Sequence, residues 1–158
     1  MKKDDLKRCS WATTNLYKEY HDKEWGKPLH DDRKLFEMLI LEGMQAGLSW
    51  QTILNKRTAF REAFDQFDYQ KIALYDEAKI DTLMQNAKIV RNRLKLKSAI
   101  INAQQFIKIQ EEYGSFDTFI WSYVNNKPIH NHFQSESELP ATTSLSDIIS
   151  KDLKKRGF

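Results

Sequence analysis

The chain has 158 residues, of which 41% are hydrophobic, and it contains only five glycines and three prolines. This composition is sufficient for one domain with a packed core, spanning residues 1–158. The single cysteine excludes an internal disulfide, and the sequence shows neither a signal peptide nor an apolar run of membrane-spanning length. We therefore expect a soluble, cytoplasmic protein without a membrane partner, and we expect it to be a monomer.

Helical periodicity dominates the sequence, so the fold class that we predict is all-α. Asp31 and Asp32 can cap a helix that ends near Gln45, and Ser49 can cap a second helix that ends near Phe64. The other helices that we expect cover residues 68–74, 80–85, 96–107, 116–123 and 144–157. In the last of these, residues 144 and 147 have the spacing of a capping box. Residues 125–140 are rich in polar residues and proline, which is typical of a loop.

Positive charge is concentrated in one segment. Residues 82–110 contain six basic side chains and no acidic one, although the net charge of the whole chain is only +3. Such segregation is typical of a binding site for a polyanion, but a solvated helix face would explain it equally well. The six residues are Lys88, Arg91, Arg93, Lys95, Lys97 and Lys108.

The start of this segment resembles a helix-hairpin-helix motif. A short predicted helix is followed by a turn at residues 86–89 and then by the long basic helix. In such a motif the hairpin amides and the N-terminus of the second helix hold a DNA phosphate. Lys88 stands where the motif usually has a glycine, so its charge would replace a close approach of the backbone. Lys88, Arg91, Arg93 and Lys95 are thus candidate DNA-binding residues.

Glu42 is the most informative acidic residue. At 100° per residue it falls beside Leu35, Met38 and Leu39 on an apolar stripe, whereas Glu37 falls on the opposite side and is predicted to face solvent. A buried carboxylate needs compensation, either from a partner inside the protein or from a ligand that donates hydrogen bonds or carries positive charge. We favour the ligand because of the aromatic residues nearby.

Five aromatic residues lie in the first third of the chain. They are Trp11, Tyr17, Tyr20, Trp25 and Trp50. Buried aromatics usually belong to the core, but Trp50 follows a turn between two predicted helices, where its side chain can face a cleft. Aromatic faces stack on bases and attract cations. A carboxylate among such faces suits a flat, positively charged heterocycle.

Two other residue pairs could bind a metal ion. Cys9 and His21 are suitable zinc ligands, but a structural zinc site needs four. The alternatives are a small buried thiol and a hydrogen-bonded core histidine. The doublets His21-Asp22 and His30-Asp31 resemble those of metal-dependent phosphohydrolases, but no predicted helix offers the additional His and Asp that this chemistry needs.

A series of segments identifies a family. In chain order they are RCSW (8–11), YHDKEWG (20–26), LFEM (35–38), LEG (41–43), QAGLSW (45–50), SF (115–116), WSYVN (121–125) and SKDLKKRGF (150–158). Together they closely resemble the type I 3-methyladenine DNA glycosylases over nearly the whole chain. The resemblance implies an all-helical, helix-hairpin-helix glycosylase fold. It also implies base-excision repair, with hydrolysis of the N-glycosidic bond of 3-methyladenine in double-stranded alkylated DNA, leaving an abasic site.

The resemblance also assigns roles to residues in the base-binding pocket. Glu42 is expected to bind the flipped base and to be the catalytic acidic residue. Tyr17, Tyr20 and Trp50 are expected to line the pocket with Trp11 nearby, and Trp50 and Tyr20 are expected to stack on the base.

The expected contacts outside the pocket come from the same resemblance. Gly47 and Leu48 would enter the base stack, and Cys9 and His21 would be the first two ligands of a zinc site. In the family the chain continues past Phe158 through a further helix and the last two zinc ligands. We therefore expect this chain to lack that C-terminal region and to bind zinc weakly or not at all. A non-catalytic DNA-binding remnant is the alternative to an active enzyme.

Overall fold

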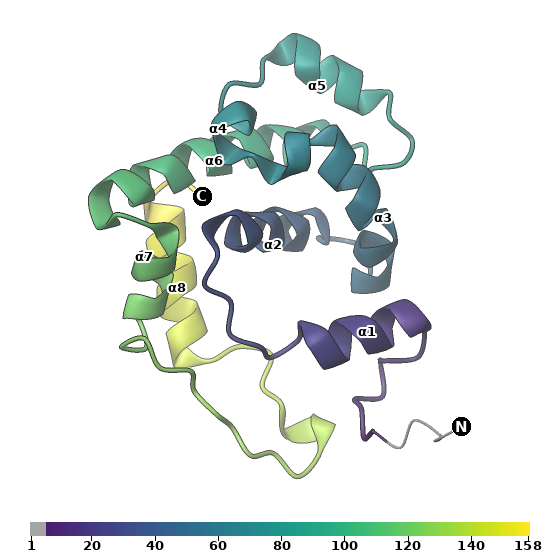
Figure 1. Ribbon diagram of the computed structural model, residues 1–158, viewed down its shortest axis with the longest axis vertical. Coiled ribbons are helices and arrows are strands. Elements are labelled where there is room, and N and C mark those ends of the chain that lie inside the picture. Colours follow the sequence, from purple (N-terminus) through teal and green to yellow (C-terminus); the bar gives the residue numbers. More distant parts are fainter. Residues whose placement is uncertain (1–5) are drawn as a thin grey trace.

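The regular secondary structure is helical throughout residues 6–158, which are the part that the computed structural model describes (Figure 1). This confirms the predicted all-α class. Within those residues, no helix combines the length and the apolar character needed to cross a membrane. The elements are α1 (Asn15–Lys23), α2 (Asp32–Met44), α3 (Trp50–Ala63), η1 (Asp65–Phe67), α4 (Tyr69–Ile72), α5 (Glu77–Met84), α6 (Arg93–Tyr113), α7 (Phe116–Ser122), η2 (Glu136–Glu138) and α8 (Ser144–Lys155).

Short polar side chains define where the helices begin. Asp31 caps α2 and Ser49 caps α3, each accepting a hydrogen bond from a backbone N–H in the first turn, which confirms both predicted caps. The predicted cap of α8 is wrong by one residue. Thr143, rather than Ser144, forms the capping box, because its side chain accepts from the Ser146 N–H and the Ser146 hydroxyl accepts in return from the Thr143 N–H.

Helix α1 was not predicted from the sequence. It begins after Thr14, whose hydroxyl accepts a hydrogen bond from the Tyr17 N–H, and among its residues only Tyr20 is buried. Its remaining residues are half-buried or exposed and mostly polar, so the chain shows no apolar stripe there. Packing against α3 holds this helix in place, with Thr14 donating to the Gln51 side chain over 2.8 Å. Tertiary contacts therefore supply what local periodicity lacks.

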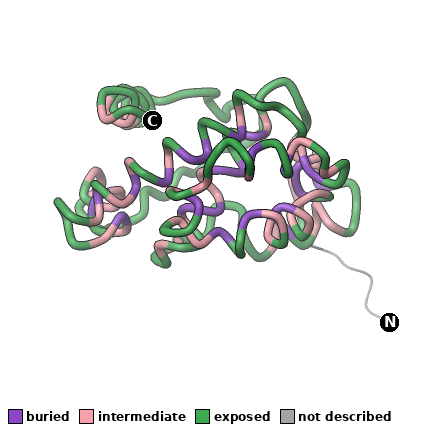
Figure 2. Tube along the Cα trace, turned by 90° about the horizontal axis from the view of Figure 1, so that it is seen from above, coloured by how far each residue is buried: buried purple, intermediate pink, exposed green. Residues whose placement is uncertain are grey.

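Helix α6 is the centre of the core. It packs against α2, α4, α5 and α7, and Figure 2 shows the buried residues gathered between these elements. Phe106 of α6 is fully buried, with its ring 5.1 Å from that of Phe36, 4.9 Å from that of Tyr69 and 4.4 Å from that of Phe116. The inner face predicted for α3 is confirmed, because Ile53, Leu54, Phe60 and Phe64 are all buried.

One carboxylate connects three helices. Asp32, the first residue of α2, accepts hydrogen bonds from the Gln110 side chain of α6 and from the backbone N–H groups of Phe116 and Asp117 at the start of α7. The three distances are 2.8, 2.9 and 2.8 Å. A negative charge at two helix N-termini is favourable for both. The arrangement fixes the angle at which α7 leaves the core.

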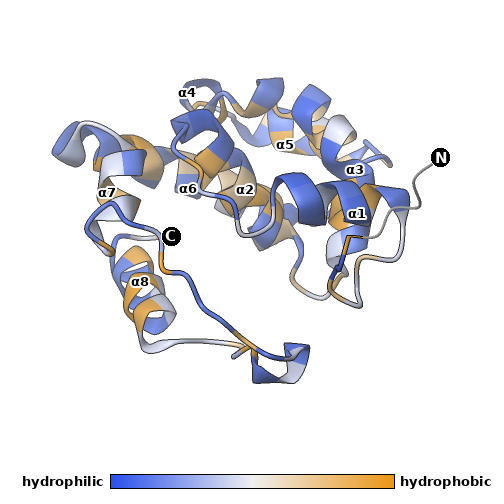
Figure 3. Cartoon of the chain, turned by 60° about the horizontal axis from the view of Figure 1, so that its bottom comes forward, coloured by the Kyte–Doolittle hydropathy of each residue, from blue (hydrophilic) through white to orange (hydrophobic). Residues whose placement is uncertain are grey.

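Helix α8 contributes no fully buried residue and lies at one side of the core, next to the label C in Figure 2. Part of its surface is apolar, as Figure 3 shows, and Ile148 is 52% exposed. Leu153 and the following Phe158 pack against the hydrophobic core, and polar contacts add to this attachment. Asp152 accepts a hydrogen bond of 2.6 Å from the Tyr123 hydroxyl, and Arg156 pairs with Glu112 at 2.8 Å.

The contact between Tyr123 and Asp152 predicts a release of α8 at high pH. Burial, followed by the bond to Asp152, raises the pKa of Tyr123 to about 12. A raised phenol pKa stabilises the folded contact below the ordinary value near 10, and this stabilisation is lost as the pH rises to about 12. The protection factors of the α8 amides, which correct the exchange rate for its intrinsic acceleration by hydroxide, should therefore fall over this range. In Tyr123→Phe the protection should be lower already at neutral pH and should show no further fall between pH 10 and about 12; unchanged protection factors would contradict the assignment.

Candidate functional site

The aromatic residues predicted to line a binding site do come together. Trp11 lies at the centre, with its ring centroid 5.3 Å from that of Tyr17, 6.2 Å from that of Tyr20 and 5.5 Å from that of Trp25. Tyr20 is in turn 5.6 Å from Trp50, at an interplanar angle of 57°. We call these five residues the aromatic cluster. It joins the segment before α1, helix α1 and the start of α3.

Trp50 carries an unsatisfied polar group in this cluster. Its indole Nε1–H is buried and has no hydrogen-bond partner among the described residues. The Tyr20 hydroxyl lies near this indole, but the two groups do not have normal hydrogen-bond geometry. A buried donor without a partner is costly, and it is often explained by a ligand or a water molecule. The N–H of Trp50 is therefore a candidate contact for a ligand with an acceptor atom.

Glu42 is close to the cluster but is not buried. The prediction that it lies on the inner face of α2 is wrong, because Glu42 is exposed beside the half-buried Met38 and Leu39. The residues that form the buried face of α2 are Phe36, Glu37, Ile40, Leu41 and Met44. The apolar residues of α2 form two stripes, and the sequence periodicity alone did not show which one packs on the core.

The electrostatic surroundings of Glu42 still differ from those of an isolated surface acid. Neighbouring protein atoms displace part of its hydration, so its pKa is raised by desolvation although the side chain touches water. Desolvation, followed by the negative charge of Glu42, raises the pKa of Tyr20. The effect of Glu42 on Tyr20 indicates that the Glu42 carboxylate lies near the Tyr20 hydroxyl. At this position the Glu42 carboxylate can pair with a cationic ligand bound at the edge of the aromatic cluster.

Glu37, which the sequence predicted to face solvent, is the acid of α2 that is buried. It is 9% exposed, and its carboxylate accepts a hydrogen bond of 2.5 Å from Arg61 of α3. The partner inside the protein that we considered for Glu42 thus belongs to Glu37. An internal arginine satisfies this carboxylate, so Glu37 needs no ligand.

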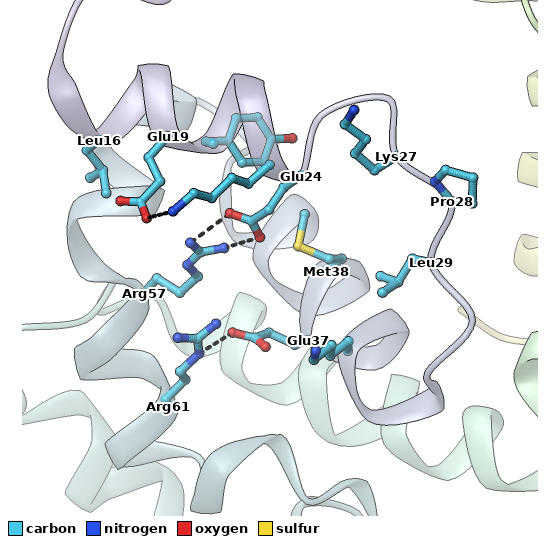
Figure 4. Close-up of a pocket in the computed structure, with 13 residues that line it drawn as sticks. Leu16, Glu19, Glu24, Lys27, Pro28, Leu29, Glu37, Met38, Arg57 and Arg61 are labelled. Atoms are coloured by element: carbon cyan, nitrogen blue, oxygen red, sulfur yellow. Dashed lines mark hydrogen bonds and ion pairs between the residues drawn. The ribbon is translucent and has the colours of Figure 1, made fainter.

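A cleft of 570 Å³ lies between α1, α2 and α3, and Tyr20 of the aromatic cluster reaches its wall (Figure 4). Two ion pairs connect the elements that border it. Arg57 binds Glu24 through two bonds of 2.7 and 2.9 Å, and Arg61 binds Glu37. Neither arginine was predicted from the sequence as part of the site; their spacing of four residues on α3, which puts them on one helical face, was the available signal. The Arg57–Glu24 pair holds the end of α1 against α3 and so helps to fix the position of Tyr20.

Cys9 and His21, the predicted zinc ligands, are adjacent. The Cys9 backbone N–H donates to His21 Nε2 over 3.3 Å, and burial, followed by the charge of Glu136, raises the pKa of the Cys9 thiol. A structural zinc site takes four ligands and needs a deprotonated thiol. Within residues 6–158 no group of three or more His, Cys, Asp or Glu side chains is placed to hold a metal ion. These residues do not by themselves fit a zinc ion, and the expectation that the chain binds zinc weakly or not at all stays a prediction.

The two His-Asp doublets make contacts that do not build a phosphohydrolase site. Asp22 is held by Arg8 and His21, and the bond from Arg8 lowers the pKa of Asp22 to about 2. In the second doublet, Asp31 caps α2 and His30 bonds to Asp117 over 2.7 Å.

The basic residues predicted to bind DNA fall into two groups. Arg93 pairs with Glu77 and Asp81 of α5, and the Lys95 ammonium donates to two backbone carbonyls. Lys88 and Arg91 are exposed in the connection between α5 and α6, and their side chains form no ion pair or hydrogen bond with the part of the chain that the structure describes. Of the four, only Lys88 and Arg91 present a charged group that is not engaged by another described residue.

Gly47 and Leu48 lie in the turn between α2 and α3. Gly47 has a φ of +78°, a conformation that glycine adopts without strain, and Leu48 is 42% exposed. The Leu48 N–H donates to the Gln45 carbonyl over 2.6 Å, which closes the turn. An exposed leucine at the tip of a hydrogen-bonded turn, two residues before Trp50, can be inserted into a partner while the cluster stays in place.

The chain belongs to the methyladenine glycosylase family, because the model of that family matches residues 11–158. This match includes the aromatic cluster, Glu42, the α2–α3 turn and the basic connection between α5 and α6. The predicted family is thereby confirmed.

Similar proteins and solved structures agree with this assignment. The chain is 49% identical to the DNA-3-methyladenine glycosylase of Haemophilus influenzae, covering 96% of this chain and 82% of the relative. It is 46% identical to DNA-3-methyladenine glycosylase 1 of Escherichia coli, covering 97% and 82%. A crystal structure of 3-methyladenine DNA glycosylase I matches with a TM-score of 0.92 and 45% identity, over 96% of this chain and 84% of that one. A variant of 3-methyladenine DNA glycosylase I in complex with 3-methyladenine matches with a TM-score of 0.93 and 41% identity, over 97% and 83%.

Proposed function

We propose that this chain is a monofunctional DNA-3-methyladenine glycosylase of base-excision repair. It hydrolyses the N-glycosidic bond of 3-methyladenine in alkylated double-stranded DNA and leaves an abasic site without cutting the strand. Membership of the methyladenine glycosylase family carries this proposal, together with 49% identity to a relative of that name. The aromatic cluster with the nearby acid Glu42 supports it, because this chemistry suits a flat cationic base.

The cluster recognises the base in three ways. Trp11, Tyr17, Tyr20 and Trp50 offer ring faces on which a flipped purine stacks. The unpaired N–H of Trp50 donates to an acceptor on the base edge. Glu42 accepts from the exocyclic amine and stabilises the positive charge that alkylation at N3 creates. Normal adenine carries no such charge, so the electrostatic attraction of Glu42 favours 3-methyladenine over adenine.

Little acid–base help is required for the bond to break. Alkylation at N3 makes the base cationic and hence a good leaving group, so the base need not be protonated as it departs. Base flipping removes it from the stack and from much of its water, and Glu42 stabilises it in the pocket. In this mechanism Glu42 binds the base and does not activate the attacking water.

The DNA-binding face is formed by the α2–α3 turn and the connection between α5 and α6. Leu48 enters the space that the flipped base leaves, with Gly47 allowing the strand to come close. Lys88 and Arg91 bind backbone phosphates, and α5, the connection and α6 act as a helix-hairpin-helix. In Figure 1 these parts lie on the same side of the molecule as the start of α3.

Release of free base from methylated duplex DNA tests this function. Incubation of the chain with DNA treated with a methylating agent should release 3-methyladenine, detected by chromatography, in excess over spontaneous depurination. Unmethylated DNA of the same sequence is the control and should release no base. A non-catalytic remnant would bind the duplex in a salt-dependent manner but would release nothing above background, and that outcome would overturn the proposed activity.

A further inference from the structure

Lys95 lies at the start of α6, but its ammonium is directed into the protein. It donates one hydrogen bond of 2.9 Å to the carbonyl of Met44, the last residue of α2, and one of 2.6 Å to the carbonyl of Ala46 in the following turn. The Met44 bond is partly buried, and the side chain of Lys95 is half-buried. These bonds connect residues 49 and 51 positions apart in the sequence.

The two acceptors are groups that the helix itself cannot satisfy. The last carbonyls of an α-helix have no intrahelical partner, and the C-terminal end of the helix dipole favours a cation. Lysine can donate three hydrogen bonds, and here two of them reach this helix end. The turn that they hold is residues 45–49, which contains Gly47 and Leu48 and leads directly into Trp50.

We propose that Lys95 is a positioning residue that fixes the α2–α3 turn to the N-terminal end of α6. Through these two bonds, the turn that carries Leu48 and the basic connection that carries Lys88 and Arg91 meet the DNA as one rigid unit. This inference rests on the DNA-binding face proposed above. It assigns Lys95 a different role from Lys88, although the sequence groups both among the basic residues of one segment.

The different orientations of the Lys95 and Lys88 side chains support this role. A lysine that serves a phosphate directs its ammonium outward, as the exposed side chain of Lys88 allows. Lys95 instead has two short bonds to backbone oxygens, which would be lost if the ammonium swung out to a phosphate. A third, longer bond also links α3 to the connection between α5 and α6, because Lys56 of α3 donates to the Lys88 carbonyl over 3.4 Å.

The decisive experiment compares Lys95→Met with Lys88→Met in the full chain. Each variant removes one positive charge and keeps the length of the side chain. Two quantities are measured for each: the slope of log binding constant against log salt concentration on a duplex with an abasic-site analogue, and the single-turnover rate of 3-methyladenine release. A residue that contacts a phosphate contributes about 0.9 to that slope.

We expect opposite results for the two variants. Lys88→Met should reduce the salt slope by about 0.9. Lys95→Met should leave the slope unchanged but slow base release about ten- to a hundredfold, since a misplaced turn disturbs the geometry of the reacting base. Lys95→Arg, which retains the charge and several donors, should restore most of the rate. A slope that falls equally in Lys95→Met, or an unchanged rate of release, would overturn the proposal.

Hydrogen exchange in the free protein separates this inference from the proposed enzymatic function. The Leu48 amide, which bonds to the Gln45 carbonyl, should exchange at least tenfold faster in Lys95→Met than in the parent chain, and the α7 amides should not change. Unchanged exchange at Leu48 would contradict the positioning role even if the chain proved inactive. If Lys95→Met does not fold, Lys95→Gln, which keeps one donor group, is measured in the same way. An unchanged slope in Lys88→Met would instead contradict the DNA-binding face.

Discussion

Replacement of Glu42 by glutamine is expected to lower kcat/KM for 3-methyladenine release about a hundredfold, as the loss of one electrostatic contact to a developing charge typically does. The change removes the negative charge that stabilises the cationic base and keeps the size of the side chain. Because Glu42 is exposed and forms no hydrogen bond or ion pair within residues 6–158, the free energy of unfolding should stay the same within about 0.5 kcal/mol. Steady-state kinetics on methylated DNA and denaturant unfolding check the two parts.

The pH dependence gives a second measurement on the same residue. Desolvation raises the pKa of Glu42, so its carboxylate is protonated at a higher pH than an ordinary glutamate. Activity should therefore begin to fall at a higher pH than the titration of an ordinary glutamate would give, and Glu42→Gln should abolish this loss of activity at acidic pH. Glu37→Gln is the matched control: it should leave excision intact but reduce stability by about 1 kcal/mol, since it weakens the bond from Arg61. Equal loss of activity in both variants would contradict the assigned roles.

Replacement of Phe106 by alanine should destabilise the protein by about 3–5 kcal/mol. The ring is fully buried and contacts the rings of Phe36, Tyr69 and Phe116, so four elements would border the resulting cavity. Denaturant unfolding measures the loss as a lower midpoint with an unchanged slope. Leu94→Ala on the same helix is the control, because Leu94 is 75% exposed and its loss should change stability by less than about 0.5 kcal/mol. A small effect of Phe106→Ala would mean that α6 is not the centre of the core.

Local signals in the sequence predicted most of the fold. Asp31 and Ser49 were recognised as caps because their short oxygen-bearing side chains satisfy the first backbone N–H groups. The inner face of α3 followed from the spacing of Ile53, Leu54 and Phe60. Helix α1 could not be found in this way, since packing on α3 rather than its own periodicity stabilises it. The one sequence signal for this helix was Thr14, a suitable N-cap residue, which precedes a polar segment.

The candidate site was predicted less completely. The aromatic cluster was identified by residue type, and its members do come together around Trp11. The two acids of α2 were assigned to the wrong environments, because Glu37 is buried by a partner on another helix, and a helical wheel contains no information about α3. The same limit applies to Lys95. Sequence shows its charge but not the two carbonyls that receive it, which come from a segment about fifty residues away.

The carboxylate of Asp32 has a consequence for how mutational data on this protein should add up. It serves the beginning of two helices and an amide from a third, so a substitution there would disturb several interfaces together. Energies measured for Asp32→Asn and for a change at Gln110 would share a term and would be counted twice if they were summed. Double-mutant cycles between residues of α2 and α7 are therefore the appropriate way to measure the interaction free energy between these helices. Single substitutions would overstate it.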